Sequence, residues 1–168
     1  FANCIIVMIQ NIIGITSQFT YGTNDVGTMD FITSLTTPYG TTTFAEGVNG
    51  RNRWLQATDP LGQTERQEFV DTSSSSVITD FGKTPPTTIS GPAPNYLIYR
   101  NSFYWNKKAM QLYPSDYTKA HIDHWLHGSD TAPNDINSCS GILESSKDAL
   151  EGRIWNTYPG QSAGDTYQ

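Results

Sequence analysis

The chain has 168 residues, with 10 lysines and arginines against 16 aspartates and glutamates, and a formal net charge of −6. That length suits one ordinary domain. The acidic balance argues against a dedicated nucleic-acid binder, because such a protein needs a basic face to meet phosphates. No stretch approaches the roughly 20 apolar residues that span a bilayer. The longest apolar run, Cys4–Ile9, suits a buried strand.

The first part of the chain favours strands. Val, Ile, Thr, Phe and Tyr dominate it, and Gly or Pro recurs every few residues. Between Thr41 and Glu46, the small residues Thr41, Thr43 and Ala45 alternate with Thr42, Phe44 and Glu46, a pattern expected of a sheet with one wet face. We therefore expect strands at residues 5–9, 12–21, 30–36, 41–46, 53–57 and 64–71.

An internal repeat has an offset of 22 residues, because residues 31–44 align with residues 53–66. Both copies place a turn between two strands, and the order of Asp or Thr, Pro, any residue and Gly fits a type I turn. A period of this length indicates hairpins that bury their faces on one another. The two turns are Thr37-Pro38-Tyr39-Gly40 and Asp59-Pro60-Leu61-Gly62.

Three regions follow from composition. Residues 1–71 are hairpin repeats of about 22 residues, and residues 72–94 are a connection rich in Ser, Thr, Pro and Gly, with one strand expected at 77–81. This connection is either a linker or an ordered crossing of a sheet edge. Residues 95–168 are an aromatic-rich β segment that we assign to the same sheet.

In that last region the pattern of residues 121–127 favours a strand over a helix. A strand puts Ile122, His124 and Leu126 on one face and the alternate residues on the other. We also expect strands at 95–100 and 102–105 (one long strand, or two with a break at Asn101), at 117–126, 141–144 and 153–158, and helical turns at 107–113 and 145–150.

Two stretches of the sequence resemble a known family. Residues 59–64 and 69–71 are similar to the Asp-Pro-x-Gly-x-Thr…Tyr-x-Tyr-Asp repeat of the Rhs (YD-repeat) family, with Phe69 in place of the first tyrosine. Residues 37–42 are a looser copy. Neither copy carries the full Tyr-Asp…Gly-Arg signature, and residues 147–154 come nearest to it. Looser matches to non-repeat segments of bacterial Rhs proteins lie at 102–108, 116–120, 124–127 and 154–161.

The resemblance implies a fold and a function. In that family many repeats form a spiral β-sheet shell that encloses a toxic C-terminal domain. We therefore expect an all-β, repeat-type antiparallel sheet of hairpins in a shell wall, with one or two short helical turns. The implied role is a non-catalytic structural segment of a polymorphic-toxin shell, secreted or on the cell surface, that encapsulates or displays a toxin domain.

The same reading predicts partners. A few turns of such a wall leave open edge strands, which invite pairing with another chain. The expected partners are other segments of a longer parent chain, a toxin cargo, or a second copy. No nucleic acid, membrane span, cofactor or metal is expected.

Two other classes remain open. A secreted carbohydrate-binding β-module would expose flat aromatic rings, for which the candidates are Trp54, Trp105, Trp125 and Trp155; the competing interpretation makes these rings core and cross-strand pairs. A small hydrolase would place His121 or His124 beside a nucleophile in a pocket. The spacing of the three histidines, His121, His124 and His127, matches no metal motif.

Overall fold

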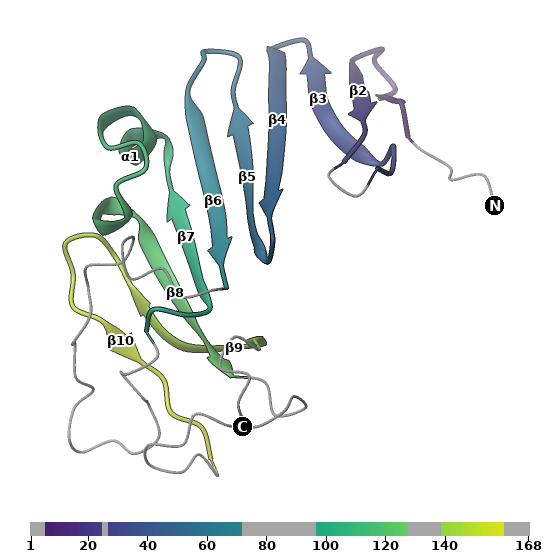
Figure 1. Ribbon diagram of the computed structural model, residues 1–168. Helices are drawn as coiled ribbons and strands as arrows, with labels where there is room; N and C mark the ends of the chain where they lie inside the picture. The colour runs from purple at the N-terminus through teal and green to yellow at the C-terminus, as the bar shows by residue number, and fades with distance from the viewer. Residues whose placement is uncertain (1–5, 25–26, 72–96, 128–138, 160–168) are drawn as a thin grey trace.

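The computed structural model describes residues 6–24, 27–71, 97–127 and 139–159. These residues form a ten-stranded antiparallel sheet in which each strand pairs with its neighbours in sequence (Figure 1). The predicted all-β class is confirmed. The strands are β1 (Met8–Gln10), β2 (Thr16–Gly22), β3 (Phe31–Thr37), β4 (Gly40–Asn49), β5 (Asn52–Thr58), β6 (Thr64–Val70), β7 (Asn101–Trp105), β8 (His121–His127), β9 (Cys139–Lys147) and β10 (Ile154–Trp155).

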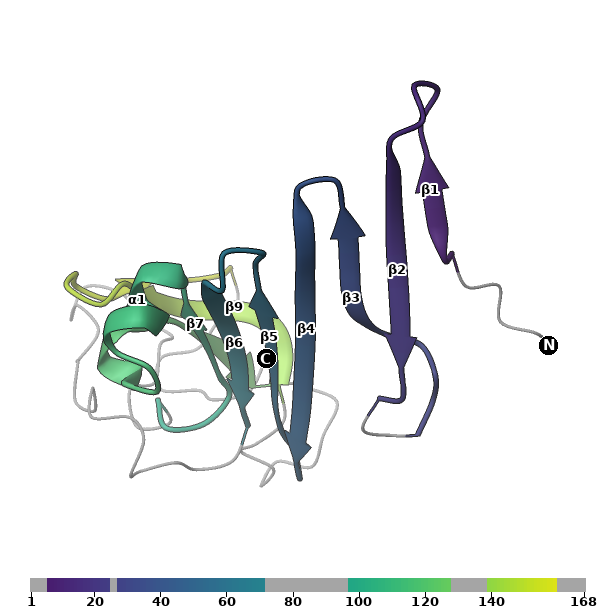
Figure 2. The same cartoon turned by 90° about the horizontal axis from the view of Figure 1, so that it is seen from above.

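The N-terminal half of the sheet is a single layer. Strands β1 to β4 stand side by side with no other described element over them (Figure 2). Along β4 the exposed and half-buried residues alternate from Thr41 to Glu46, as the sequence pattern predicts. No residue of β1 to β5 is fully buried, so this part of the sheet has two accessible faces.

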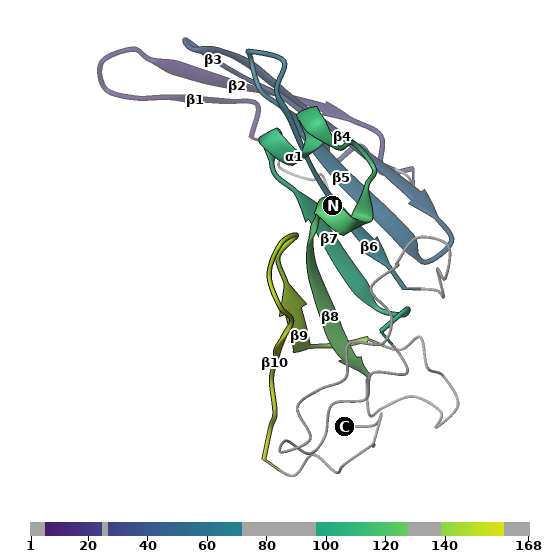
Figure 3. The same ribbon diagram turned by 90° about the vertical axis from the view of Figure 1, so that its left-hand side faces the viewer.

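A helix covers one face of the sheet further along the chain. Helix α1 (Lys107–Leu112) and the 3₁₀ turn η2 (Tyr117–Lys119) follow β7, and α1 lies on one side of the sheet in Figure 3. The core beneath them contains Val70, Phe103, Trp105, Ala120 and Ile122, with Ala109, Met110 and Tyr117 packed against it. We call this side of the sheet the helix face.

The opposite side is apolar over β2 to β6. The register pairs Phe19 with Leu35, and Phe44 with Ala57. Because side chains alternate along a strand, Leu55 and Phe69 share that side with Phe44. We call it the apolar face.

Three hairpin turns share one construction, with Asn or Asp at the first position and Gly at the fourth. In each, the fourth N–H donates to the first carbonyl: Gly14 to Asn11, Gly27 to Asn24, and Gly62 to Asp59, at 2.9–3.1 Å. The first side chain also accepts an N–H from the residue after the glycine, at 2.8–2.9 Å. The glycines have φ of +79° to +84°, which only glycine adopts without strain.

This construction corrects one predicted strand. Residues 12–21 are not one strand, because Asn11 closes a turn through Ile15 and β2 begins only at Thr16. The Asn11 side chain gives the backbone of Ile13 and Ile15 the hydrogen bonds that a strand partner would otherwise supply.

The repeat turns themselves are in contact. They join β3 to β4 and β5 to β6, and the two lie next to each other at the same end of the strands (Figure 1). A Cβ placed on Gly40 would lie 2.5 Å from Cβ of Pro60. The proline of the second turn therefore packs on the bare backbone of the first.

The turns also differ from each other. In the first, Thr37 pairs with Gly40 across a two-residue loop, and Gly40 has a φ of +120°. In the second, Thr58 pairs with Thr64 and a five-residue loop separates them. Gly40 and Gly62, which stand at the 22-residue offset, therefore have different structural roles.

Gly40→Ala should destabilise the fold more than Gly62→Ala. Both substitutions force a Cβ into a left-handed backbone, which costs about 1–2 kcal/mol. Only the Cβ at position 40 also collides with Pro60, because nothing lies within 4 Å of the one at position 62. Urea unfolding of both variants checks this. Adding Pro60→Gly should recover part of the Gly40→Ala loss; equal losses for the two alanine variants would show that the turns do not support each other.

The second half of the chain differs from prediction at several places. The helical turn at 107–113 and the strand at 102–105 are confirmed, whereas Leu97–Arg100 are not a strand, and Arg100 has a positive φ of 54°. The helical turn at 145–150 is wrong, because β9 continues to Lys147. The expected strand 117–126 begins with the 3₁₀ turn η2, and 153–158 shortens to β10. The expected strand at 77–81 lies outside the described residues.

Candidate functional site

A shallow groove lies on the apolar face of the described chain. Two adjoining cavities form it, of about 490 Å³ and about 320 Å³, and both are lined by Phe31 and Leu55. Phe19, Leu35 and Phe44 line the smaller cavity, while Val48 and Phe69 line the larger one. The groove therefore runs across the strands from β2 to β6, over an apolar floor.

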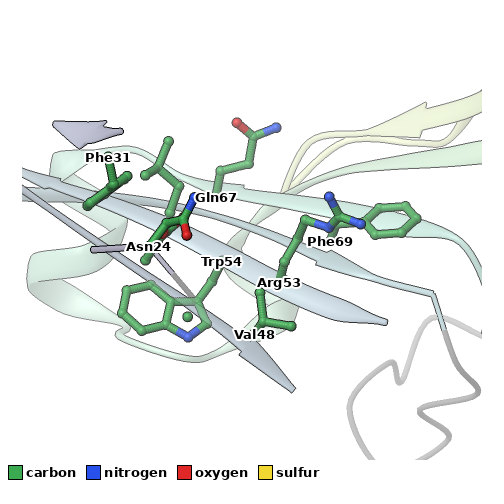
Figure 4. Close-up of a pocket in the computed structure, with 10 residues that line it drawn as sticks. Asn24, Phe31, Val48, Arg53, Trp54, Gln67 and Phe69 are labelled. Atoms are coloured by element: carbon green, nitrogen blue, oxygen red, sulfur yellow. The ribbon is translucent and has the colours of Figure 1, made fainter. Parts of the chain in front are cut away.

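A few polar side chains lie in the larger cavity (Figure 4). They include Glu46, Arg53 and Gln67, and Arg53 is exposed. The Oε1 atom of Glu46 is buried and has no hydrogen-bond partner in the structure. The residues that line the two cavities include no histidine, cysteine, serine or lysine. The groove offers apolar area, the cation Arg53 and the carboxylates of Glu46 and Asp30, which suits binding more than catalysis.

Trp54 belongs to the residues around this groove, but it alternates with Arg53 and Leu55 along β5, so its ring lies on the helix face, opposite the groove floor. Its ring lies over Gly47, its partner on β4, where an added Cβ would collide with the indole. The Arg66 guanidinium lies 4.1 Å from the ring centroid, a cation–π contact. A glycine opposite a large aromatic ring thus gives the ring a flat place on the sheet.

The other three candidate tryptophans do not join it. Trp105 is 1 % exposed and belongs to the core, so the sugar-binding interpretation is wrong for this ring. Trp125 is half-buried, and its Nε1 donates to Oγ of Ser102 at 2.8 Å. Trp155 is half-buried on β10, with the Arg153 guanidinium 5.8 Å from its ring. The four rings are divided among core and separate strands, so they make no common platform.

Arg66 continues from Trp54 into a chain of contacts on the helix face. Its Nε donates to Oε1 of Glu68 at 2.6 Å, and the Tyr117 hydroxyl donates to Oε2 of the same carboxylate at 2.6 Å. Burial and the bond to Glu68 raise the pKa of Tyr117. This tyrosine therefore stays protonated and holds η2 against β6.

The repeat turn at Asp59 also holds helix α1. Nζ of Lys107 donates to Oδ2 of Asp59 at 2.6 Å. This bond, followed by the N–H of Gln63, lowers the pKa of the Asp59 carboxyl. Asp59 thus closes its own turn through Oδ1 and anchors the first residue of α1 through Oδ2.

The predicted alternation of β8 is confirmed, since Ile122, His124 and Leu126 are buried. It separates the histidines. His124 is fully buried, with Nε2 at 2.9 Å from Glu144 Oε2 and Nδ1 at 3.2 Å from Asn101 Oδ1. His121 lies at the surface, with Nδ1 at 2.8 Å from Asp148 Oδ1 and Nε2 at 3.1 Å from Asp123 Oδ1.

Neither imidazole is placed to activate a nucleophile, because carboxylates and an amide occupy both nitrogens of each ring. The backbone register puts His127 opposite Cys139. Desolvation raises the pKa of the Cys139 thiol, whereas a catalytic thiol needs a lowered pKa. The described contacts therefore give the hydrolase interpretation no site.

His121 should make the fold more stable in its charged form. Partial burial lowers the pKa of His121, but the hydrogen bonds and charges of Asp148 and Asp123 outweigh it, so the pKa is raised. Only an imidazolium can donate from both nitrogens. The stabilisation is then complete below the unfolded pKa of about 6.5 and is lost as the pH rises through the higher folded value.

The test is the difference in urea midpoint between the wild type and His121→Gln, measured near pH 5.5 and near pH 8.5. We expect a larger difference at the lower pH. Taking the difference cancels the contribution of His124, whose pKa is lowered by burial and whose effect on stability runs the other way. A difference independent of pH would contradict the double contact.

No cluster of three or more His, Cys, Asp or Glu side chains that could hold a metal occurs within the described ranges. The same ranges contain no helix that is long and apolar enough to cross a membrane. Comparisons of the chain with models of protein families, with curated proteins and with solved structures find no match.

The groove is not among the features predicted from the sequence. The signal that could have indicated it was the alternation that places Phe44 beside Leu55 and Phe69 on one side of the sheet. The repeat residues Thr37, Pro38, Gly40, Asp59, Pro60 and Gly62 do come together, at neighbouring turns.

Proposed function

We propose that the chain is a non-catalytic wall segment of a larger β-sheet shell, of the kind that the Rhs (YD-repeat) resemblance implies. The observation that carries the proposal is the contact of Pro60 with Gly40, in which one hairpin turn packs on the next. A unit completed by its neighbour can be repeated without limit, and repetition is how a wall is built.

The open form of the sheet supports the same proposal. Strands β1 to β5 bury no residue fully, although an isolated domain of this size normally gathers its strands around a core. A single curved layer instead separates an inside from an outside. The apolar groove then gives one side of the wall a surface on which an enclosed polypeptide could rest.

Partners follow from this proposal. A wall segment contacts its neighbours in the parent chain through its edge strands, or a second copy where those neighbours are absent. The parent protein would be secreted or displayed at the cell surface, and would enclose or present a C-terminal toxin domain.

The sequence that flanks the chain in its source tests the proposal first. We expect further hairpins on both sides, with Asn or Asp three positions before Gly in their turns and spacings near the 22 residues between the two repeat turns. Flanks without such hairpins would overturn it.

A second experiment tests the enclosing role in the parent protein. Limited proteolysis should leave a C-terminal domain intact while the wall is closed, and should digest that domain when it is expressed alone. Equal digestion of the domain in both settings would leave the wall without its cargo.

Carbohydrate binding is the second candidate, because the half-buried Trp54 ring lies flat on the sheet over Gly47. Quenching of tryptophan fluorescence by a panel of oligosaccharides tests it, with Trp54→Ala as the binding variant and Trp155→Ala as the control. Saturable quenching that only Trp54→Ala abolishes would favour this candidate over the wall.

A further inference from the structure

The outermost strand of the sheet is unusually apolar at its surface. Ile6, Val7, Met8 and Ile9 are each 53–58 % exposed. The turn that follows adds Ile12, Ile13 and Ile15, which are also exposed. β1 ends the strand order, so its outer edge has no described strand beside it.

This edge also lacks the features that keep sheet edges apart. Residues 1–24 contain no Asp, Glu, Lys, Arg or His, although the chain carries a net charge of −6. They contain no proline either, and the β1–β2 pairing shows no bulge. Natural edge strands are normally blocked by a lysine, a proline or a bulge. An uncharged run of β-branched residues instead accepts another strand.

The hydrogen bonds of the hairpin show which backbone groups are free to pair. The N–H of Phe19 donates to the carbonyl of Val7 at 2.8 Å, so the N–H and C=O of Val7 point towards β2. Those of the next residue, Met8, point to the outer edge. The strand can therefore extend the ladder at Met8 without giving up its pairing with β2.

We infer that β1 is a strand-docking edge, and that in the 168-residue chain its occupant is β1 of a second copy, paired antiparallel. Two identical strands related by a two-fold axis match residue for residue. Pairing of the two β1 strands brings no charged side chains together, whereas other surfaces of the two acidic chains repel each other. Ile6 and Met8 lie on one side of the strand and Val7 and Ile9 on the other, so both faces gain apolar neighbours.

This inference rests on the proposed function in one respect, since both require β1 to be an open edge. Where a parent chain supplies a preceding strand, that strand takes the same edge. The tests are nevertheless separate. Flanking hairpins can be present when the isolated chain stays single, and the isolated chain can pair when its flanks hold no hairpins.

The experiment is sedimentation velocity with light scattering over a concentration series. We expect the mass of the wild type to rise from 18.6 kDa to twice that value. Met8→Pro removes the outward N–H and should hold the mass at 18.6 kDa, as should Met8→Lys, which puts a charge on the edge. Leu61→Lys is the matched control, because Leu61 is an exposed apolar residue on a distant turn. This variant should dimerise like the wild type.

Circular dichroism confirms that each variant keeps its sheet, and Met8→Lys decides alone if Met8→Pro unfolds. A wild type that stays at 18.6 kDa throughout overturns the inference. Pairing that survives both Met8 substitutions, or that Leu61→Lys also abolishes, overturns it too, because the contact would then lie elsewhere.

Discussion

Trp105→Ala should destabilise the protein by about 3–5 kcal/mol, the usual cost of removing a large buried aromatic side chain. The Trp105 ring centroid lies 5.0 Å from that of Tyr117 and 6.0 Å from that of Phe103. Its Nε1 donates to the carbonyl of Asp116 at 3.0 Å. Alanine would leave a cavity beneath α1 and an unpaired carbonyl beside it. A loss of this size is a large share of the free energy of unfolding of an ordinary domain.

Trp155→Ala is the matched control, because its half-buried ring lies on the short strand β10. We expect it to cost about 1 kcal/mol, as is usual outside a core. Urea unfolding followed by far-ultraviolet circular dichroism measures both, since that signal comes mainly from the backbone. Trp105→Phe should fall between them, because it keeps a ring but loses the bond to Asp116. Similar losses for the two alanine variants would show that α1 does not close the core of this sheet.

Local chemistry predicts the turns of this fold well. The residue types of the turn Asp59-Pro60-Leu61-Gly62 predict its hydrogen bonds, and the structure contains them. The turns at Asn11 and Asn24 have Asn in place of Asp at the first position, the same Gly at the fourth, and no proline, and the residue composition around the first of them predicts a strand at 12–21. The side chain of an asparagine is as good an acceptor as that of an aspartate, so the Asn-x-x-Gly spacing is the more general signal.

Long-range packing decides what the sequence could not. The sequence does not distinguish the four tryptophans, but only Trp105 lies where α1 packs on the sheet. It is therefore the one of the four that is fully buried. The helical turn expected at 145–150 failed for the same kind of reason. Ser145 and Ser146 pair with β8, and the ladder outweighs the weak helical preference of those residues. The groove likewise exists only once β2 to β6 are placed in register.

The buried polar cluster beside His124 gives the last large effect. Glu144 Oε2 lies 2.9 Å from Nε2 of His124, and both side chains are almost wholly buried. Asn101 fixes the other side of the ring, because its Nδ2 donates to the carbonyls of Leu97 and Tyr99 and its Oδ1 therefore faces Nδ1. With Oδ1 as an acceptor, the Nδ1 proton is committed, and one further proton must lie between Nε2 and the carboxyl of Glu144.

Glu144→Leu should therefore cost about 1–3 kcal/mol, because it leaves Nε2 of a buried imidazole without its partner. Glu144→Gln should cost much less, because the amide can either accept from or donate to Nε2. Adding His124→Leu to Glu144→Leu should cost less than the sum of the two single variants, since the double variant leaves no lone imidazole facing leucine. Urea midpoints of the four variants at one pH give these values, and Glu151→Leu on the exposed surface should change little. Additive losses of unfolding free energy would mean that backbone ladders and apolar contacts hold β7, β8 and β9 together. The coupling between His124 and Glu144 would then add nothing to stability.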